Sequence, residues 1–331
     1  MKIILASSER FSGCVIDALM KNGHEVVGVI SPARGIYERQ LQGPRVFLHR
    51  LRGWDVLESC EKRGINFRVA RHLDEGATTA FFKAQKADLL LLFGWPTMVK
   101  QETMALFTHG SMNIHPSLLP KLRGADPLFD IVDTGQASFG VTFHKVVDEL
   151  DAGNIVLQEP IPFAPGDTYD DLYFRLLAHI HRHTAQALAQ LKALPEGTPQ
   201  KGEPTVVRKF NNHMRVLDFH ETHDRIRRRT HACFSHHTRL ASVGERLFHF
   251  SKCKLVEGVA PNFPQPGAIQ SNGPFSLVIL AGARCLRISG ICFHGRPKWM
   301  TPLLLSKYCK PGTQMDEAKT TLAIMGNHKD L

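Results

Sequence analysis

The first 160 residues alternate short apolar segments with amphipathic ones, and this alternation limits the possible folds more than any other feature. The segments KIILAS (2–7) and EVVGVIS (25–31) flank an amphipathic stretch around Val15 to Met20. The segments DLLLLFG (88–94) and GSMNIH (110–115) continue the pattern of strands separated by helices. Strands that alternate with helices pair in parallel, because each helix carries the chain back to the start of the sheet. The sequence therefore predicts an α/β fold with a Rossmann-like, mostly parallel sheet.

The rest of the chain predicts a long helix followed by a smaller β-rich part. Phe139 to Lys145 and Ile155 to Pro162 are typical of strands, and a helix is expected from Asp167 to about Leu194. Beyond a Pro- and Gly-rich stretch, short β-rich pieces separated by Gly, Pro and Asn predict an OB-like, partly open barrel. We expect four parts: a catalytic domain at 1–193, a linker at 194–211, a β-rich domain at 212–315 and a tail at 316–331.

The positive charge of the chain is concentrated in its C-terminal part. Residues 201–331 hold 20 Lys and Arg against 9 Asp and Glu, whereas residues 1–200 hold 21 against 22. A basic helix around Arg225 to Arg229 contributes to this excess. Such an asymmetry indicates either a polyanionic partner or a basic surface that is simply solvated, and the sequence leaves both open.

Several classes of protein do not fit the sequence. The turn after the first strand, ASSERFSG (6–13), lacks the G-x-G-x-x-G fingerprint, so dinucleotide binding there is not expected. The apolar run Leu89 to Trp95 is far shorter than the roughly 18 residues that span a bilayer, so no membrane partner is expected. The seven cysteines form no C-x-x-C pair and predict reduced thiols in the cytoplasm. His179 and His183 have the spacing of a zinc pair, but no third ligand stands near them, and no metal is expected.

One segment, SMNIHPSLLPKLRG (111–124), carries the candidate chemistry. It ends a predicted strand in Asn113 and His115, whose side chains share one face because strand side chains repeat every two residues. In open α/β sheets the ligand crevice lies at the carboxyl ends of the strands, where these residues emerge. Asp151 follows on a polar loop, DELDAG (148–153). An imidazole, a carboxylate and a carboxamide together predict an acid-base centre that can also stabilise an oxyanion.

These residues also carry a resemblance to a known family. The pattern Asn113-x-His115-Pro-Ser-Leu-Leu-Pro-Lys-x-Arg-Gly, with GVT (140–142) and Leu-Asp-x-Gly (150–153) downstream, resembles the 10-formyltetrahydrofolate-dependent formyltransferase family. That family includes methionyl-tRNA formyltransferases and sugar N-formyltransferases. The resemblance extends over about residues 1–310 and is strongest in 85–160.

The resemblance implies transfer of a formyl group from 10-formyltetrahydrofolate to a primary amine. Asn113, His115 and Asp151 are the implied catalytic triad: Asn113 and a protonated His115 stabilise the oxyanion, while Asp151 orients the imidazole and helps remove the amine proton. The segment LLFGWPTM (91–98) and the loop 147–150 are expected to contact the folate. The implied folate-binding residues are Phe93, Gly94, Trp95, Met98, Val147, Asp148, Glu149 and Leu150, and the implied substrate-binding residues are Ser117, Lys121 and Arg123.

The formyl acceptor is less constrained than the reaction. The main hypothesis is an amine on a small metabolite, such as an amino sugar, because two segments depart from the pattern of the tRNA enzymes. The turn SSERFS (7–12) replaces their Gly-Thr-Pro turn, and THACFSHHTRLASVGERLFHF (230–250) lacks their Pro-Trp-Pro-like turn. The alternative is methionyl-tRNA, held by the basic C-terminal domain. A formyltetrahydrofolate hydrolase and a non-catalytic RNA-binding module are alternatives of other classes.

Overall fold

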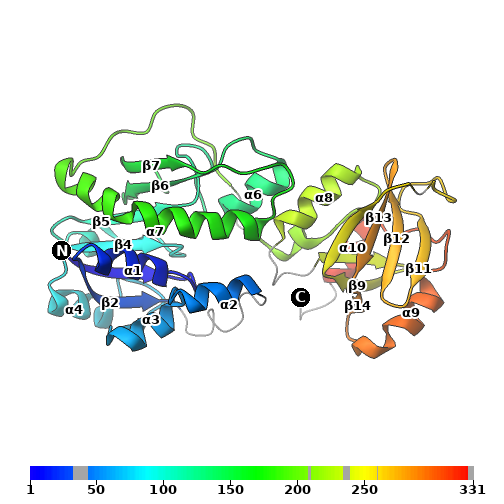
Figure 1. The fold of residues 1–331 in the computed structure, drawn as a ribbon, viewed down its shortest axis with the longest axis horizontal. Helices are drawn as coiled ribbons and strands as arrows, with labels where there is room; N and C mark the ends of the chain where they lie inside the picture. The colour runs from blue at the N-terminus through cyan, green and yellow to red at the C-terminus, as the bar shows by residue number, and fades with distance from the viewer. Residues whose placement is uncertain (33–43, 208–209, 234–238, 259, 327–331) are drawn as a thin grey trace. The chain divides into compact units, whose positions relative to one another are not determined.

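The computed structural model describes residues 1–32, 44–207, 210–233, 239–258 and 260–326 (Figure 1). The chain divides into two compact units. The first comprises Met1–Ile131, Gln136–Ala164 and Asp170–Lys209, and the second comprises Val132–Gly135, Pro165–Tyr169 and Phe210–Leu331. Residues 234–238, part of the stretch that departs from the tRNA enzymes, lie outside the described residues.

A seven-stranded sheet forms the centre of the first unit, in the order β3-β2-β1-β4-β5-β6-β7. Strands β1 to β5 pair in parallel, and β6 and β7 are added antiparallel at one edge. The predicted Rossmann-like, mostly parallel sheet is confirmed. Its strands are β1 (Lys2–Ser7), β2 (Glu25–Ser31), β3 (Phe67–Val69), β4 (Leu89–Phe93), β5 (Ser111–His115), β6 (Gly140–Lys145) and β7 (Ile155–Pro160).

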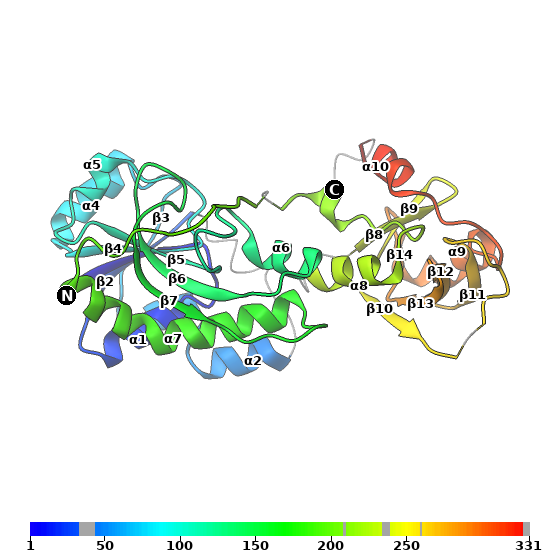
Figure 2. The same ribbon diagram turned by 90° about the horizontal axis from the view of Figure 1, so that it is seen from above.

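Helices cover both faces of this sheet, because its central strands are buried on both sides. Strand β4 reads LLLLF and is buried along its whole length, as a strand between two helical layers must be. Figure 2 shows α1 and α7 on one side of the sheet and α4 and α5 on the other. The helices of this unit are α1 (Gly13–Lys21), α2 (Pro44–Leu51), α3 (Val56–Arg63), α4 (Gly76–Gln85), α5 (Gln101–Met104) and α7 (Tyr169–Ala193), and α6 (Pro127–Thr134) joins it to the segment 132–135.

The second unit is β-rich, as predicted from the sequence. Its strands form a four-stranded sheet, β10-β13-β12-β11, and a three-stranded sheet, β14-β9-β8, around a core that includes Phe219, Phe248 and Phe250. Its elements are η2 (Asn212–Arg215), α8 (His223–Ala232), β8 (Arg239–Val243), β9 (Arg246–Phe250), β10 (Lys252–Val256), β11 (Ile269–Gly273), β12 (Ser276–Ala281), β13 (Arg284–Ser289), β14 (Cys292–Phe293), η3 (Lys298–Met300), α9 (Thr301–Tyr308) and α10 (Ala318–Gly326).

The described part of the expected tail, residues 316–326, packs onto the second unit. The Asp316 carboxylate accepts hydrogen bonds from the Ser242 hydroxyl and from the backbone N–H of Gly244. Met325 on α10 is buried in a small apolar cluster with Leu240 of β8. This packing was not visible in the sequence because the apolar residues of 318–326 form only a short pattern.

Part of the positive charge of the basic helix α8 is paired with an aspartate inside the second unit. The Asp133 carboxylate accepts hydrogen bonds from Arg225 Nη1 (2.7 Å) and from Arg229 Nε (2.5 Å) and Nη2 (2.9 Å). The Nε of Arg228 donates to the Asp133 carbonyl at 3.2 Å. Only 8% of the Asp133 side chain is exposed. Three of the arginines that the sequence offered as contacts for a polyanion therefore hold one aspartate.

Replacing Asp133 with Ala is expected to destabilise the second unit. The change leaves the guanidinium groups of Arg225 and Arg229 partly buried without their shared carboxylate. Because both arginines retain some exposure to water, we expect a loss of about 2 kcal/mol rather than the larger cost of a fully buried pair. Calorimetric unfolding measures the effect, and Asp224→Ala, at a carboxylate whose side chain is 56% exposed, is the control. An unfolding temperature equal to that of the control contradicts the prediction.

Candidate active site

Asn113 and His115 lie on β5, next to the point where the sheet changes from parallel to antiparallel pairing. Asn113 pairs with Leu92 of β4 on one side and with His144 of β6 on the other. His115 ends the strand opposite Thr142. Both side chains approach Asp151, as the period of two predicted. The site thus lies over one face of the sheet, near the carboxyl end of β5.

Asp151 reaches this face from the loop between β6 and β7. Its backbone has a φ of +48°, a left-handed conformation that is uncommon for a residue with a side chain. Gly153 follows, and a Cβ at that position would lie 1.9 Å from the Lys145 carbonyl oxygen. The Asp-x-Gly spacing is therefore a steric requirement of the loop. Only with glycine at position 153 can the chain fold back tightly enough to bring Asp151 over β5.

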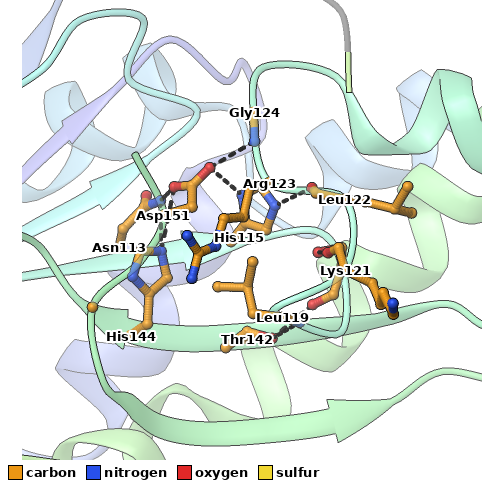
Figure 3. A network of polar contacts seen from close by, with 12 residues as sticks. Asn113, His115, Leu119, Lys121, Leu122, Arg123, Gly124, Thr142, His144 and Asp151 are labelled. Carbon is orange, nitrogen blue, oxygen red and sulfur yellow. Dashed lines mark hydrogen bonds and ion pairs between the residues drawn. The ribbon is translucent and has the colours of Figure 1, made fainter. Parts of the chain in front are cut away.

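The polar side chains converge on the Asp151 carboxylate (Figure 3). Its Oδ2 accepts a hydrogen bond from the Gly124 N–H at 2.8 Å and lies 3.5 Å from Nδ1 of His115. Its Oδ1 accepts from Nδ2 of Asn113 at 3.4 Å. The three residues that the sequence proposed as a triad are thus brought together. Gly124 completes the group with a backbone donor.

His144 belongs to the same cluster and was missed in the sequence. Its Nε2 lies 3.1 Å from Nδ2 of Asn113 and 3.5 Å from Oδ1 of Asp151, and its Nδ1 lies 2.7 Å from the Lys145 carbonyl oxygen. A carbonyl only accepts, so Nδ1 carries a hydrogen, and in the neutral ring Nε2 accepts from Asn113. The sequence feature that could have identified His144 is its position in the strand GVTFHK. A strand that pairs antiparallel with β5 can place a residue directly opposite Asn113.

His115 lies in the cluster as a neutral base. Its Nε2 lies 2.8 Å from the Leu122 carbonyl oxygen, so Nε2 carries the hydrogen and Nδ1 presents a lone pair toward Asp151. Burial lowers the pKa of His115 below its usual 6.5, although the negative charge of Asp151 opposes the shift. In the free protein at neutral pH the ring is therefore uncharged. The protonated His115 expected from the resemblance belongs to the tetrahedral intermediate, and the free protein presents the unprotonated ring from which that state can form.

Asp151 is held in its anionic form. Burial by itself raises the pKa of the Asp151 carboxyl, but the contact with His144, the positive charge that His115 carries once it is protonated in acid, and the Gly124 N–H together lower it to about 2. Throughout the neutral range the site thus pairs a fixed negative charge with an unprotonated imidazole. A proton that arrives on Nδ1 of His115 is stabilised at once by the carboxylate.

The residues expected to bind folate lie on two segments that pack against one core cluster. Trp95, after β4, and Val146, at the start of the Asp151 loop, both contact this cluster. Met98, Val147 and Leu150 have exposed fractions of 48%, 39% and 46%. Phe93 is buried, Gly94 has a φ of +64°, and Asp148 and Glu149 are exposed on the loop. The two segments therefore offer apolar surface for a flat ring.

The three residues expected to contact the acceptor differ in their environment. Ser117 is fully buried, and its hydroxyl donates to the Lys121 carbonyl. Lys121 is exposed. The Arg123 guanidinium donates to Glu149 at 2.7 Å and to Gln200 at 2.9 Å. Of the three, Lys121 alone has an exposed side chain, while Ser117 and Arg123 hold neighbouring loops.

Two further carboxyl groups interact with each other, Glu9 after β1 and Asp126 before α6. Glu9 accepts from the Tyr173 hydroxyl at 2.8 Å, and a Cβ on Gly94 would lie 2.7 Å from Oε1 of Glu9. Burial raises the pKa of Glu9. Burial and the charge of Glu9 raise the pKa of Asp126 to about 7, against the effect of the Phe129 N–H. The turn SSERFS thus contributes a carboxyl group beside the segment expected to bind folate.

The structure also bears on two other expectations from the sequence, which concern metal binding and membrane crossing. In the described ranges, no group of three or more His, Cys, Asp and Glu side chains is arranged to hold a metal ion. His179 and His183 stack with their ring centroids 5.8 Å apart on α7. No helix in the described part of the chain is both long and apolar enough to cross a membrane.

Replacing Asp151 with Asn is expected to change how stability depends on pH. The Asp151 carboxyl has a folded pKa of about 2 against an ordinary value of 3.8, so it contributes stability above about pH 4 that is lost as the pH falls toward 2. The difference corresponds to about 2 kcal/mol. Asp151→Asn should lower the free energy of unfolding by about this amount at pH 7 and by little at pH 2. Urea denaturation at both values measures it, with Asp148→Asn in the same loop as the control. Equal losses at the two pH values contradict the prediction.

Curated relatives support a specific family. The chain is 31% identical over 192 residues to the methionyl-tRNA formyltransferase of Thermotoga maritima, a match that covers 58% of this chain and 59% of that protein. It is 30% identical over 239 residues to the methionyl-tRNA formyltransferase of Variovorax paradoxus, with 70% and 73% covered. The first match thus spans about three fifths of the relative's length.

Solved structures share the fold at low sequence identity. HypX from Aquifex aeolicus in complex with tetrahydrofolic acid superposes with a TM-score of 0.66 at 17% identity, covering 94% of this chain and 48% of that chain. The N-formyltransferase from Helicobacter canadensis, in complex with folinic acid and dTDP-3-aminofucose, gives 0.58 at 17% identity, with 87% and 99% covered. WlaRD, a sugar 3N-formyl transferase, gives 0.60 at 16% identity, with 90% and 99% covered.

The family model for formyl transferases matches residues 1–188, which include the whole seven-stranded sheet and all three residues of the predicted triad. This match and the relative from Variovorax paradoxus agree with the motifs read from the sequence. The chain belongs to the formyl transferase family.

Proposed function

We propose that the protein is an N-formyltransferase that moves a formyl group from 10-formyltetrahydrofolate to a primary amine. The observation that carries the proposal is the convergence of Asn113, His115 and Asp151 within hydrogen-bonding or ion-pairing range, on the fold of this family. These are the groups that amine acylation requires, namely a base for the amine proton, a charge that stabilises the protonated base, and a donor for an oxyanion.

The base in this scheme is His115, with Asp151 as its partner. Attack by the amine makes its nitrogen acidic, and Nδ1 of His115 accepts the proton. The Nε2–H stays on the Leu122 carbonyl, which keeps the ring in one orientation. The carboxylate 3.5 Å away stabilises the imidazolium that forms. The low pKa of Asp151 keeps the proton on His115, from which it can pass to the leaving nitrogen of the folate.

Asn113 is the proposed donor to the oxyanion. Its two Nδ2 hydrogens face His144 and Asp151 in the free protein. One of them must turn toward the developing negative charge, and loss of such a donor typically costs about 2.7 to 4 kcal/mol of transition-state stabilisation. His144 is well placed to hold the amide ready for this change.

The folate is proposed to lie between the segment 93–98 and the loop 147–150. The exposed apolar side chains of Met98, Val147 and Leu150 support this placement, because a pterin ring needs apolar contacts on its faces. Phe93, Gly94, Trp95, Asp148 and Glu149 complete the proposed site. Glu149 also bonds Arg123, so the loop is partly fixed before ligand binds.

We propose an amine on a small metabolite, such as an amino sugar, as the acceptor. The turn Ser7–Ser12 brings the Glu9 carboxyl beside Gly94, at the position where the tRNA enzymes carry Gly-Thr-Pro. Methionyl-tRNA is the second candidate, supported by the similarity to the tRNA enzymes and by exposed basic residues of the second unit, such as Lys254 and Arg287, which face each other on β10 and β13.

The proposal also includes the domain bounds and the location of the protein, and it competes with two other functions. Residues 1–193 are proposed as the catalytic domain and 212–315 as the β-rich domain. Residues 194–211 are proposed as a linker of which part packs on the first unit, and 316–331 as a tail whose described part packs on the second. The protein is proposed to act in the cytoplasm. A formyltetrahydrofolate hydrolase would release formate without an amine, and a non-catalytic RNA-binding module would leave the folate unchanged. Product analysis separates both from a transferase.

Substitutions in the triad test the proposed chemistry. His115→Ala and Asn113→Ala should each lower kcat by at least about 100-fold, because each removes a group used in the transition state. Binding of folinic acid, followed by thermal shift and by Trp95 fluorescence, should persist in both variants, since the proposed folate walls are untouched. His72→Ala, at an exposed histidine in the same unit, is the control. Turnover by His115→Ala within threefold of the control refutes the assignment.

The acceptor is tested with two substrates at two salt concentrations. We expect formylation of dTDP-3-aminofucose, used as the amino-sugar probe, with only a modest dependence on salt. If tRNA is the acceptor, activity toward methionyl-tRNA should fall steeply with salt, since each phosphate contact releases counterions.

A variant that lacks exposed positive charges on the second unit separates the two candidate acceptors further. Lys252→Ala/Lys254→Ala/Arg287→Ala removes exposed charges from β10 and β13, and Lys62→Ala/Lys83→Ala/Lys192→Ala removes the same charge from exposed sites on the first unit. The first variant should leave amino-sugar formylation unchanged. Strong methionyl-tRNA formylation that is lost in the first variant and kept in the second overturns the metabolite proposal.

A further inference from the structure

The segment after α7, residues 198–207, is built into the catalytic unit. Thr198 and Ile155 exchange two backbone hydrogen bonds of 2.8 Å at the start of β7. Val206 forms a parallel bridge with Arg123. Between these two anchors, the segment passes the Asp151 loop and the loop that follows β5. Its composition predicted a linker, yet it behaves as a strap across the site.

Gln200 joins this strap to the Asp151 loop. Its Nε2 donates to the carbonyl oxygens of Asp151 (2.7 Å) and Gly153 (2.9 Å), and its Oε1 accepts from Nη2 of Arg123 at 2.9 Å. One carboxamide thus satisfies the two carbonyl groups that flank the tight turn at Ala152. These bonds hold the loop where Asp151 adopts its left-handed backbone conformation, which costs free energy unless surrounding contacts impose it.

The other end of the strap fixes the peptide groups that contact the catalytic side chains. The Thr205 hydroxyl accepts from the Leu122 N–H at 2.8 Å, and the Thr205 carbonyl accepts from the Arg123 N–H at 2.8 Å. The Leu122 carbonyl accepts from His115, and the Gly124 N–H donates to Asp151. The strap therefore fixes the position of the peptide group that orients His115 and of the loop that carries Asp151.

We propose that Gln200 is a positioning residue of the formyl-transfer reaction, which holds the Asp151 carboxylate against His115 through the carbonyl groups of the loop. The inference rests on the proposed function for the reaction itself. In this role Gln200 acts through Asp151, because its carboxamide bonds the loop carbonyl groups and Arg123. Loss of the Gln200 carboxamide leaves Asp151 chemically intact but free to move. A displacement of about 1 Å from productive geometry can lower the rate roughly 100-fold.

Two substitutions separate the contacts of Gln200. Gln200→Leu removes all three hydrogen bonds at nearly the same size. Gln200→Glu keeps an acceptor for Arg123 but turns an oxygen toward the carbonyl groups of Asp151 and Gly153, to which it cannot donate. If the hydrogen bonds to the carbonyl groups position Asp151, both variants should lose activity to a similar extent. Gln190→Leu, the same replacement at an exposed glutamine on α7, is the matched control.

Hydrogen exchange and kinetics are both measured. In Gln200→Leu and Gln200→Glu, amides of 146–153 should exchange about tenfold faster than in the wild type, with the sheet and α7 unchanged. With dTDP-3-aminofucose or methionyl-tRNA as acceptor, kcat should fall roughly 10- to 100-fold, while KM for 10-formyltetrahydrofolate stays within about threefold.

Three results overturn the proposal: loop exchange and kcat equal to those of Gln190→Leu, faster exchange throughout the first unit, or wild-type kcat in Gln200→Glu. A wild-type protein that formylates neither acceptor refutes the proposed function instead. In that case the exchange data decide whether Gln200 holds the loop, with faster exchange confined to 146–153 in support and unchanged exchange against.

Discussion

The site depends on one buried negative charge, the Asp151 carboxylate, which a loop brings over the face of a strand. A loop has no core of its own, so the position of the carboxylate is set by hydrogen bonds to the Gly124 N–H and Asn113 and by the backbone contacts of Gln200. Gly153 permits the turn, and Asp151 itself adopts a left-handed conformation. A charge that is desolvated must be compensated locally. The surrounding donors meet this requirement and leave the carboxylate anionic.

The elements with a strong local signal were predictable from the sequence. Strands β1, β2 and β4 are apolar runs between helices, and the amphipathic stretch near 15–20 and the helix expected over 167–194 appear as α1 and α7. Asn113 and His115 share a face because strand geometry requires it. The spacing Asp-x-Gly was also visible in the sequence, whereas the steric reason for Gly153 came from the structure. These features depend on residues close together in the chain, where periodicity and sterics act directly.

The features that were missed depend on contacts between residues distant in the chain. His144 enters the site because β6 pairs with β5 in one register, 31 residues away. Gln200 lies in a stretch with linker composition, 49 residues from Asp151. Asp133 binds arginines of α8 more than 90 residues away, which no local pattern indicates. The neutral state of His115 was likewise hidden, because burial is a property of the folded chain.

The protonation states suggest an order of events for the proposed reaction. With Asp151 anionic and His115 neutral, the free site carries a single negative charge. Accepting a proton from the attacking amine makes the pair neutral overall, and this change takes place in a buried environment where separated charges interact strongly. The proton therefore moves toward the carboxylate as negative charge develops on the formyl oxygen near Asn113. If His115 were protonated from the start, its pair with Asp151 would already be neutral, and this driving force would be lost.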